Sequence, residues 1–179
     1  MFYKNFKKFL DSLDNYAFIK KYSKRTGNFM GLNLDDLTDL PYETLKNTVP
    51  DLFDSGSFEK AIFEIVKHYK KNITFGKVRR QKNPKKLMFL LWVHDQYKKI
   101  GDIEAKYLYT PPDSKLLQAG IRDLDILGDL NMVDTLANGD VLKWEEIRRL
   151  PYSTVFNKML KNTIEARINK KLIEINKLK

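Results

Sequence analysis

The sequence predicts an all-α fold: a compact helical bundle with a projecting basic arm or hairpin and a long C-terminal helix. Three observations lead to this prediction. Apolar residues recur at three- and four-residue steps through most of the 179-residue chain, which is typical of amphipathic helices. Strand-like composition is found in one short stretch, within residues 72–84. The last segment keeps an apolar stripe over roughly 27 residues, long enough for one helix of about 40 Å.

The N-terminal part, residues 1–71, is predicted to form several helices. Apolar spacing indicates a first helix from about Tyr3 to Tyr22, which a polar turn at residues 23–30 follows. Pro41 suits the first turn of a short helix, and Pro50 is expected to stop that helix. Ser57 is a favourable N-cap for a further helix that ends near Lys71.

Residues 72–84 are predicted to form the basic arm or hairpin. The stretch begins with β-prone residues and continues into cationic side chains, which need anionic partners if they are buried. The arm is therefore expected to contact phosphate groups or an acidic protein surface, and a solvated loop is the alternative. The predicted contact residues are Lys77, Arg79, Arg80, Lys82, Lys85 and Lys86.

Residues 85–150 are predicted to be core helices. The longest runs from about Pro84 to Leu108 and ends before Pro111 and Pro112, because proline cannot continue a helix. A second covers 116–127 and is closed by Gly128, and two shorter helices cover 130–137 and 141–150 on either side of a turn at 138–140.

Residues 151–179 are predicted to form a projecting C-terminal helix that opens at Pro151. Such a basic amphipathic helix can dock in a partner's groove, lie on a membrane surface or contact nucleic acid. Docking to a protein is favoured because the apolar stripe is mainly aliphatic. The predicted docking residues are Phe156, Leu160, Ile164, Arg167, Ile168, Lys171 and Leu172.

Length and composition fit one domain, residues 1–179, and exclude several classes of site. The chain has no cysteine, which rules out disulfides, thiolate zinc sites, iron–sulfur clusters and cysteine nucleophiles. Its longest apolar run, Leu87 to Val93, is too short to span a membrane. The first residues lack the apolar stretch of a signal peptide, so the protein is expected to remain where it is made.

The sequence does not predict an enzyme, a cofactor or a metal site. The two histidines, His68 and His94, lie on different predicted helices, and a metal site at His94-Asp95 would need further ligands. His94 is expected at the edge of the core and His68 in solvent. The aspartates that cluster in 35–39 and 123–129 favour helix N-termini and solubility. No phosphate-binding glycine loop or nucleophile elbow occurs in the sequence.

Charge is distributed in alternating blocks. The net charge is +10 and the isoelectric point is about 9.5. Residues 61–100 carry 11 basic and 2 acidic residues, whereas residues 101–150 carry 6 basic and 10 acidic residues. This pattern fits a nucleic-acid-binding protein, and it equally fits a subunit whose basic face meets a neighbour's acidic face.

Residues 87–173 resemble virion structural proteins of crAss-like tailed bacteriophages. The resemblance is in the segments Leu90–Gln96, Tyr107–Asp113, Ala119–Ile121, Leu142–Ile147 and Leu150–Asn157. It implies a head–tail connector or ring (adaptor) subunit located in the virion and synthesised in the host cytoplasm. The partners it implies are further copies in a ring, the portal and other tail or ring proteins, with possible sequence-independent contact to double-stranded DNA and none to a membrane.

Two other functions remain open from the sequence. The basic residues within 61–100 also fit a sequence-independent nucleic-acid-binding protein. A tail-assembly chaperone would associate only transiently and would be absent from the mature particle.

Overall fold

The structure, a computed structural model, describes residues 25–112 and 114–177 and is mostly helical. The predicted all-α class is confirmed. The predicted helix over residues 3–22 lies outside the described residues. The sequence predicted one domain, whereas the contacts within the chain gather in two units, Met1–Lys99 and Ile100–Lys179. We describe each unit by itself.

The first unit begins with a small hairpin that the sequence did not predict. Strands β1 (Asn28–Phe29) and β2 (Leu32–Asn33) pair antiparallel, with Phe29 opposite Leu32. The two residues between them, Met30 and Gly31, have φ angles of 54° and 82°. Positive φ at both positions is typical of a type I′ turn, whose twist suits a two-residue hairpin.

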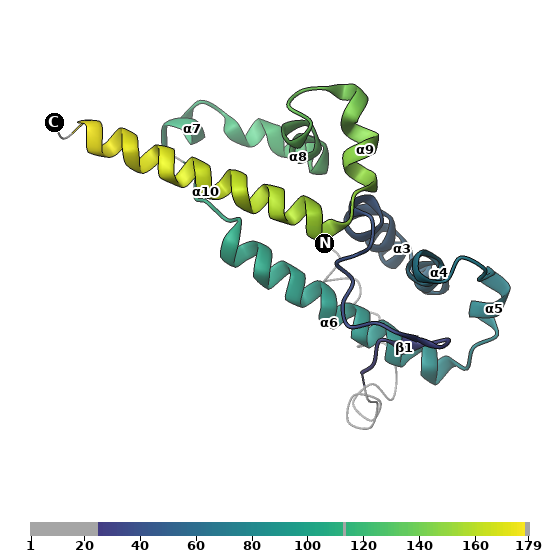
Figure 1. Cartoon of the computed structure of the whole chain (residues 1–179). Coiled ribbons are helices and arrows are strands. Elements are labelled where there is room, and N and C mark those ends of the chain that lie inside the picture. Colours follow the sequence, from purple (N-terminus) through teal and green to yellow (C-terminus); the bar gives the residue numbers. More distant parts are fainter. Residues whose placement is uncertain (1–24, 113, 178–179) are drawn as a thin grey trace. The chain divides into compact units, whose positions relative to one another are not determined.

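The hairpin packs on helix α6 (Asn83–Tyr107), which lies along it in Figure 1. The Phe29 ring stacks on Phe89 at 4.9 Å between ring centroids, and Phe89 stacks on Trp92 at 5.5 Å. A Cβ atom on Gly27 would lie 2.8 Å from the Trp92 ring and 2.1 Å from the carbonyl oxygen of Leu34. Only glycine therefore allows the backbone to approach the indole this closely.

A continuous helical segment follows the hairpin, and here the prediction for Pro50 was wrong. A π-helical turn, η1 (Thr44–Thr48), leads directly into α3 (Val49–Asp54), with Pro50 in the first turn of α3. Proline is tolerated there because the amide hydrogens of a first turn need no partner within the helix. In an i→i+5 turn, the donor facing the Leu45 carbonyl would be the nitrogen of residue 50, which in proline has no hydrogen. The Tyr97 hydroxyl, 2.6 Å from the Leu45 oxygen, donates to it instead.

The core of the first unit lies where η1, α3, α4 (Phe58–Tyr69) and α6 meet. The apolar face of α4 is buried, as its sequence period predicted. The largest side chains with less than 2% of their surface exposed come from these four elements, from the loop before η1 and from residue 78: Leu37, Leu40, Leu45, Val49, Phe53, Ile62, Ile65, Val66, Val78, Phe89 and Leu91.

The predicted basic arm is a helix packed against the first unit, so the prediction of a projecting arm or hairpin was wrong. Residues Phe75–Arg79 form α5, which contacts α4. Val78 is fully buried, and the Phe75 ring packs edge-to-face on Phe63 at 5.8 Å. These apolar side chains hold α5 to the body of the unit although its neighbours are cationic. The β-prone residues before it had indicated a strand, but the burial of Val78 and the packing of Phe75 on Phe63 outweigh that local preference.

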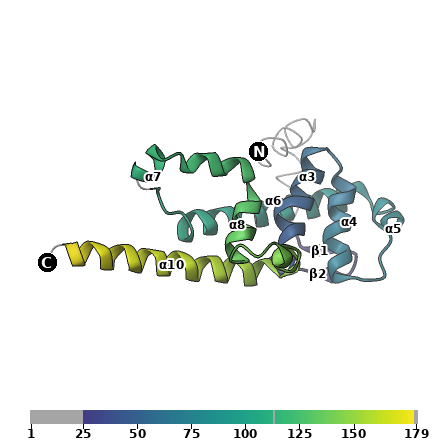
Figure 2. The same ribbon diagram turned by 90° about the horizontal axis from the view of Figure 1, so that it is seen from above.

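The second unit contains short helices and one long one (Figure 2). They are α7 (Ser114–Gln118), the 3₁₀ helix η2 (Ile121–Leu127), α8 (Asp129–Leu136), η3 (Val141–Lys143), α9 (Trp144–Arg149) and α10 (Tyr152–Lys177). The predicted helix over 116–127 is divided, because Gly120 has a φ of 86° and ends α7 before η2 begins. The turn at residues 138–140 and the long C-terminal helix are confirmed.

Few apolar side chains of the second unit are buried. The most enclosed are Ile100, Val133, Ala137, Tyr152 and Val155. Polar contacts add to this small core. The Tyr152 hydroxyl donates to Glu104 at 2.8 Å, and the Trp144 indole donates to Asp134 at 3.0 Å.

Candidate functional site

The predicted basic contact residues do not form one free surface. Lys86 is 8% exposed and forms an ion pair with Glu59 of α4. Its ammonium group also donates to the Arg79 carbonyl at 3.4 Å, and the Arg79 guanidinium lies 3.7 Å from Glu59. The cationic residues of α5 and the start of α6 are therefore partly used to attach these helices to α4. Lys86 is a structural residue, which corrects its prediction as a contact residue.

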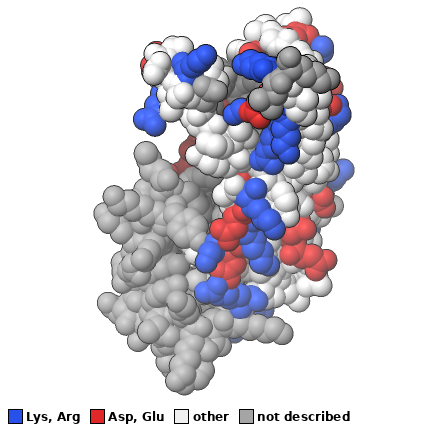
Figure 3. Space-filling view, turned by 90° about the vertical axis from the view of Figure 1, so that its left-hand side faces the viewer, with Lys and Arg blue, Asp and Glu red and all other residues white. Residues whose placement is uncertain are grey.

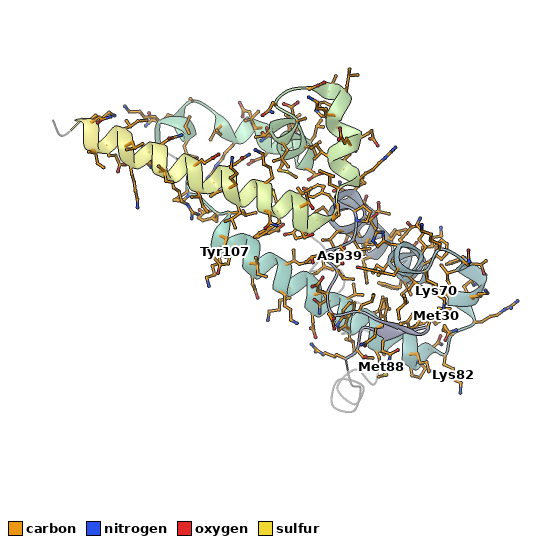
Figure 4. All side chains as sticks on the ribbon, in the orientation of Figure 1. Met30, Asp39, Lys70, Lys82, Met88 and Tyr107 are labelled. Carbon is orange, nitrogen blue, oxygen red and sulfur yellow. The ribbon has the colours of Figure 1, made fainter. Side chains whose placement is uncertain are left out.

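The other predicted basic residues are exposed. Lys77, Arg80, Lys82 and Lys85 have side chains in solvent, and we call these four residues the basic surface. Lys85 borders a hollow of about 440 Å³ between the hairpin and α6, together with Asn28, Met30, Gln81 and Met88. Figure 4 labels Met30, Met88 and Lys82 in this region.

Positive charge is not gathered into one field on the face shown in Figure 3. There, Lys and Arg side chains lie beside Asp and Glu side chains.

The C-terminal helix α10 is attached to its own unit along one face. Tyr152 and Val155 are buried, and the ring of Phe156 lies 6.0 Å from that of Tyr152. Further along, the Arg167 guanidinium donates to the carbonyls of Tyr107 and Tyr109, at 3.1 and 3.0 Å. Phe156 and Leu160 are half-buried. Phe156 and Arg167, which the sequence predicted as docking residues, therefore make contacts inside the unit.

The opposite side of α10 carries an exposed aliphatic stripe. Ile164, Ile168, Leu172 and Ile175 are 45%, 51%, 51% and 53% exposed. At about 100° per residue, these four positions fall on one side of the helix, turned away from the side that carries Tyr152 and Val155. We call these four residues the aliphatic stripe. It contains three of the predicted docking residues, and Lys171, a fourth, is exposed on its flank.

A second exposed apolar region lies on η2. Leu124, Ile126 and Leu127 are 42%, 90% and 44% exposed, and Asp123, Asp125 and Asp129 lie among or next to them. We call residues 121–129 the acidic apolar segment. Its leucines and isoleucines have the composition of a core helix, so the sequence did not predict an exposed surface here. In the structure these residues lie on a 3₁₀ helix that follows Gly120, and their side chains are exposed.

A hollow of about 270 Å³ lies between α8 and the first turns of α10. Leu108, Met132, Leu136 and Met159 supply its apolar walls. Methionine adapts its shape readily, so this hollow suits an apolar side chain from a partner.

The two histidines lie in the environments that the sequence predicted. His94 is at the edge of the core, as predicted, with 17% of its side chain exposed, and its Nδ1 is 3.5 Å from Asp95. Burial lowers the pKa of His94, against the opposing effect of Asp95. His68 is exposed, as predicted. Within residues 25–112 and 114–177, no group of three or more His, Cys, Asp or Glu residues is placed to hold a metal ion. Nor does this part of the chain contain a helix long and apolar enough to cross a membrane.

Comparison with protein-family models, with curated proteins and with solved structures found no match to this chain.

Proposed function

We propose that this protein is a structural assembly subunit that binds other proteins through its second unit. The observation that carries the proposal is the contrast between the two units. The large hydrophobic side chains that are exposed in the described residues all lie beyond residue 99, whereas those described in the first unit are buried or half-buried. Contiguous exposed apolar surface on a folded protein marks an interaction site.

The free energy that burial of these exposed side chains would contribute supports this function. Fully burying a Leu or Ile side chain contributes about 1.5–3 kcal/mol. Because each member of the aliphatic stripe is about half exposed, covering it would contribute on the order of 1 kcal/mol.

The specific form we propose is a ring or head–tail adaptor subunit in the virion of a crAss-like tailed phage. This part of the proposal depends on the resemblance of residues 87–173 to virion proteins of those phages. A well-packed first unit and an incompletely covered second unit suit a subunit that becomes fully buried only in an assembly.

The test of this form is the composition of purified phage particles. We expect mass spectrometry of mature virions to detect the protein, and electron microscopy to show density for it between portal and tail. Detection in assembly intermediates alone would support a tail-assembly chaperone instead. A monomer that is absent from virions and intermediates would contradict the proposal.

The basic surface supports a second candidate function, sequence-independent binding of nucleic acid. Four exposed cations within nine residues are enough for phosphate contact. The test leaves Lys86 unchanged, because its ion pair with Glu59 joins α6 to α4. We expect neutralisation of Arg80, Lys82 and Lys85 to abolish DNA binding and its salt dependence if this function holds. Binding that the triple substitution leaves unchanged would refute it.

A further inference from the structure

The charged residues around the aliphatic stripe on α10 restrict which surface can bind it. The second half of α10, residues 161–177, carries five basic and two acidic residues. Two such helices side by side would bring like charges together, and like-charge pairs oppose association. Symmetric pairing of α10 with α10 is therefore disfavoured.

The acidic apolar segment has the complementary properties. Its nine residues carry three aspartates and one arginine. It exposes three large aliphatic side chains, and Ile126 is 90% exposed. An aliphatic helix with positive flanks and an aliphatic surface with negative flanks are matched in both apolar character and charge.

We propose that the α10 stripe of one copy binds the acidic apolar segment, residues 121–129, of a second copy. The interface joins two different surfaces, so each copy keeps one free stripe and one free segment after pairing. Contacts of this head-to-tail kind continue from copy to copy and close into a ring or extend as a filament. This inference rests on the proposed assembly function and specifies the partner and the residues that bind it.

Two sets of variants of the full chain separate the two surfaces. A stripe variant carries Ile168→Glu and Leu172→Glu, and a segment variant carries Leu124→Lys and Ile126→Lys. All four residues are exposed, so both variants should keep the helical circular dichroism of the unchanged protein. The control is Leu142→Lys, which places the same charge at an 88% exposed leucine of η3, outside both surfaces.

Sedimentation velocity over a concentration series measures the association. We expect the unchanged protein and the Leu142→Lys control to associate equally, and each of the two variants to associate at least tenfold more weakly. The decisive sample is the mixture of the two variants. The segment variant still has an intact stripe and the stripe variant an intact segment, so the mixture should form a 1:1 dimer that grows no further. A symmetric α10–α10 interface would let the segment variant associate as strongly as the unchanged protein, alone and in the mixture, and would overturn the inference.

Charge exchange provides a test that alters no apolar side chain. Lys171→Glu alone and Asp125→Lys alone should each weaken association, and the two together in one chain should restore it. Lack of restoration would overturn the pairing of these two surfaces. An unchanged protein that stays monomeric at all concentrations would also overturn it. The assembly function would then still be decided separately, by detection of the protein in virions.

Discussion

At the scale of single residues, two half-buried tyrosines of the first unit differ in the hydrogen bonding of their hydroxyl groups. The Tyr97 hydroxyl donates to the Leu45 carbonyl, which cannot be paired by Pro50. Burial raises the pKa of Tyr97 well above its usual range, so the hydroxyl keeps its proton and remains a donor. The Tyr69 hydroxyl is buried and has no hydrogen-bond partner among the described residues.

This difference predicts opposite results for the same substitution. Tyr97→Phe leaves the Leu45 carbonyl buried without a donor, so we expect it to lower the free energy of unfolding by about 1–3 kcal/mol. Tyr69→Phe removes an unpaired polar atom, and we expect a change within about 0.5 kcal/mol or a small gain. Urea denaturation of both variants measures these values. Equal losses would show that the Tyr97 hydrogen bond does not decide the stability of the π-helical turn.

His94 predicts a pH dependence for the first unit. Because burial lowers its pKa in the folded state, the unfolded chain binds a proton more readily than the folded one. The stability that the neutral imidazole contributes is complete above its ordinary pKa of about 6.5 and is lost as pH falls through the lower folded value. We expect the melting temperature to fall on acidification from pH 7 to 5.5, and His94→Gln to reduce this slope. An equal slope in the variant would assign the effect to other groups.

At the scale of elements, periodicity predicted the helices that bury one face over several turns. The segments that became α4, α6 and α10 were all identified, because their apolar residues repeat with the period of a helix. The hairpin was missed because each strand has two residues, too few to show alternation. Helix α5 was missed because its fold depends on Phe75 and Val78 contacting distant residues, and its local composition favours a strand.

The candidate site could be predicted only in part for the same reason. Ile164, Ile168 and Leu172 were recognised as docking residues because an aliphatic stripe on a long basic helix is visible in sequence. Burial of Lys86 was not, since the sequence does not show that Glu59 lies beside it. Nor does it show that η2 is a 3₁₀ helix with its aliphatic side chains exposed.

Lys86 and Lys85 are neighbours with different expected roles, which a pair of substitutions tests. Lys86→Ala removes a buried cation from its ion pair with Glu59, whose side chain is 39% exposed, and from its hydrogen bond to the Arg79 carbonyl. We expect a loss of about 1–2 kcal/mol in the free energy of unfolding, because these acceptors lose a charged donor and the packing of the Lys86 stem is lost. Lys85→Ala, at an exposed position, should change it by less than about 0.5 kcal/mol. Chemical denaturation gives both numbers, and a Lys86→Ala value as small as that of Lys85→Ala would contradict the structural role.

At the scale of the whole molecule, the two units differ in how completely each buries its apolar side chains. The first unit buries aromatic and aliphatic side chains from β1 and from each of its described helices, whereas the second buries few and exposes many. A helix whose apolar side chains lack partners depends on its intrinsic propensity, which in water is marginal. The second unit should therefore open locally more often than the first, and association should change it most.

Hydrogen exchange measured by mass spectrometry tests this difference over the full chain. In dilute protein we expect slow exchange in α4 and the first half of α6, and fast exchange in η2 and the second half of α10, whose side chains are exposed. At concentrations where the protein associates, exchange should slow in residues 121–129 and 161–177, because binding one surface to the other suppresses local opening of both. The first unit should be unchanged and serves as the internal control. Protection confined to α10 would indicate a different acceptor on the second copy, and protection of the basic surface instead would assign association to the first unit.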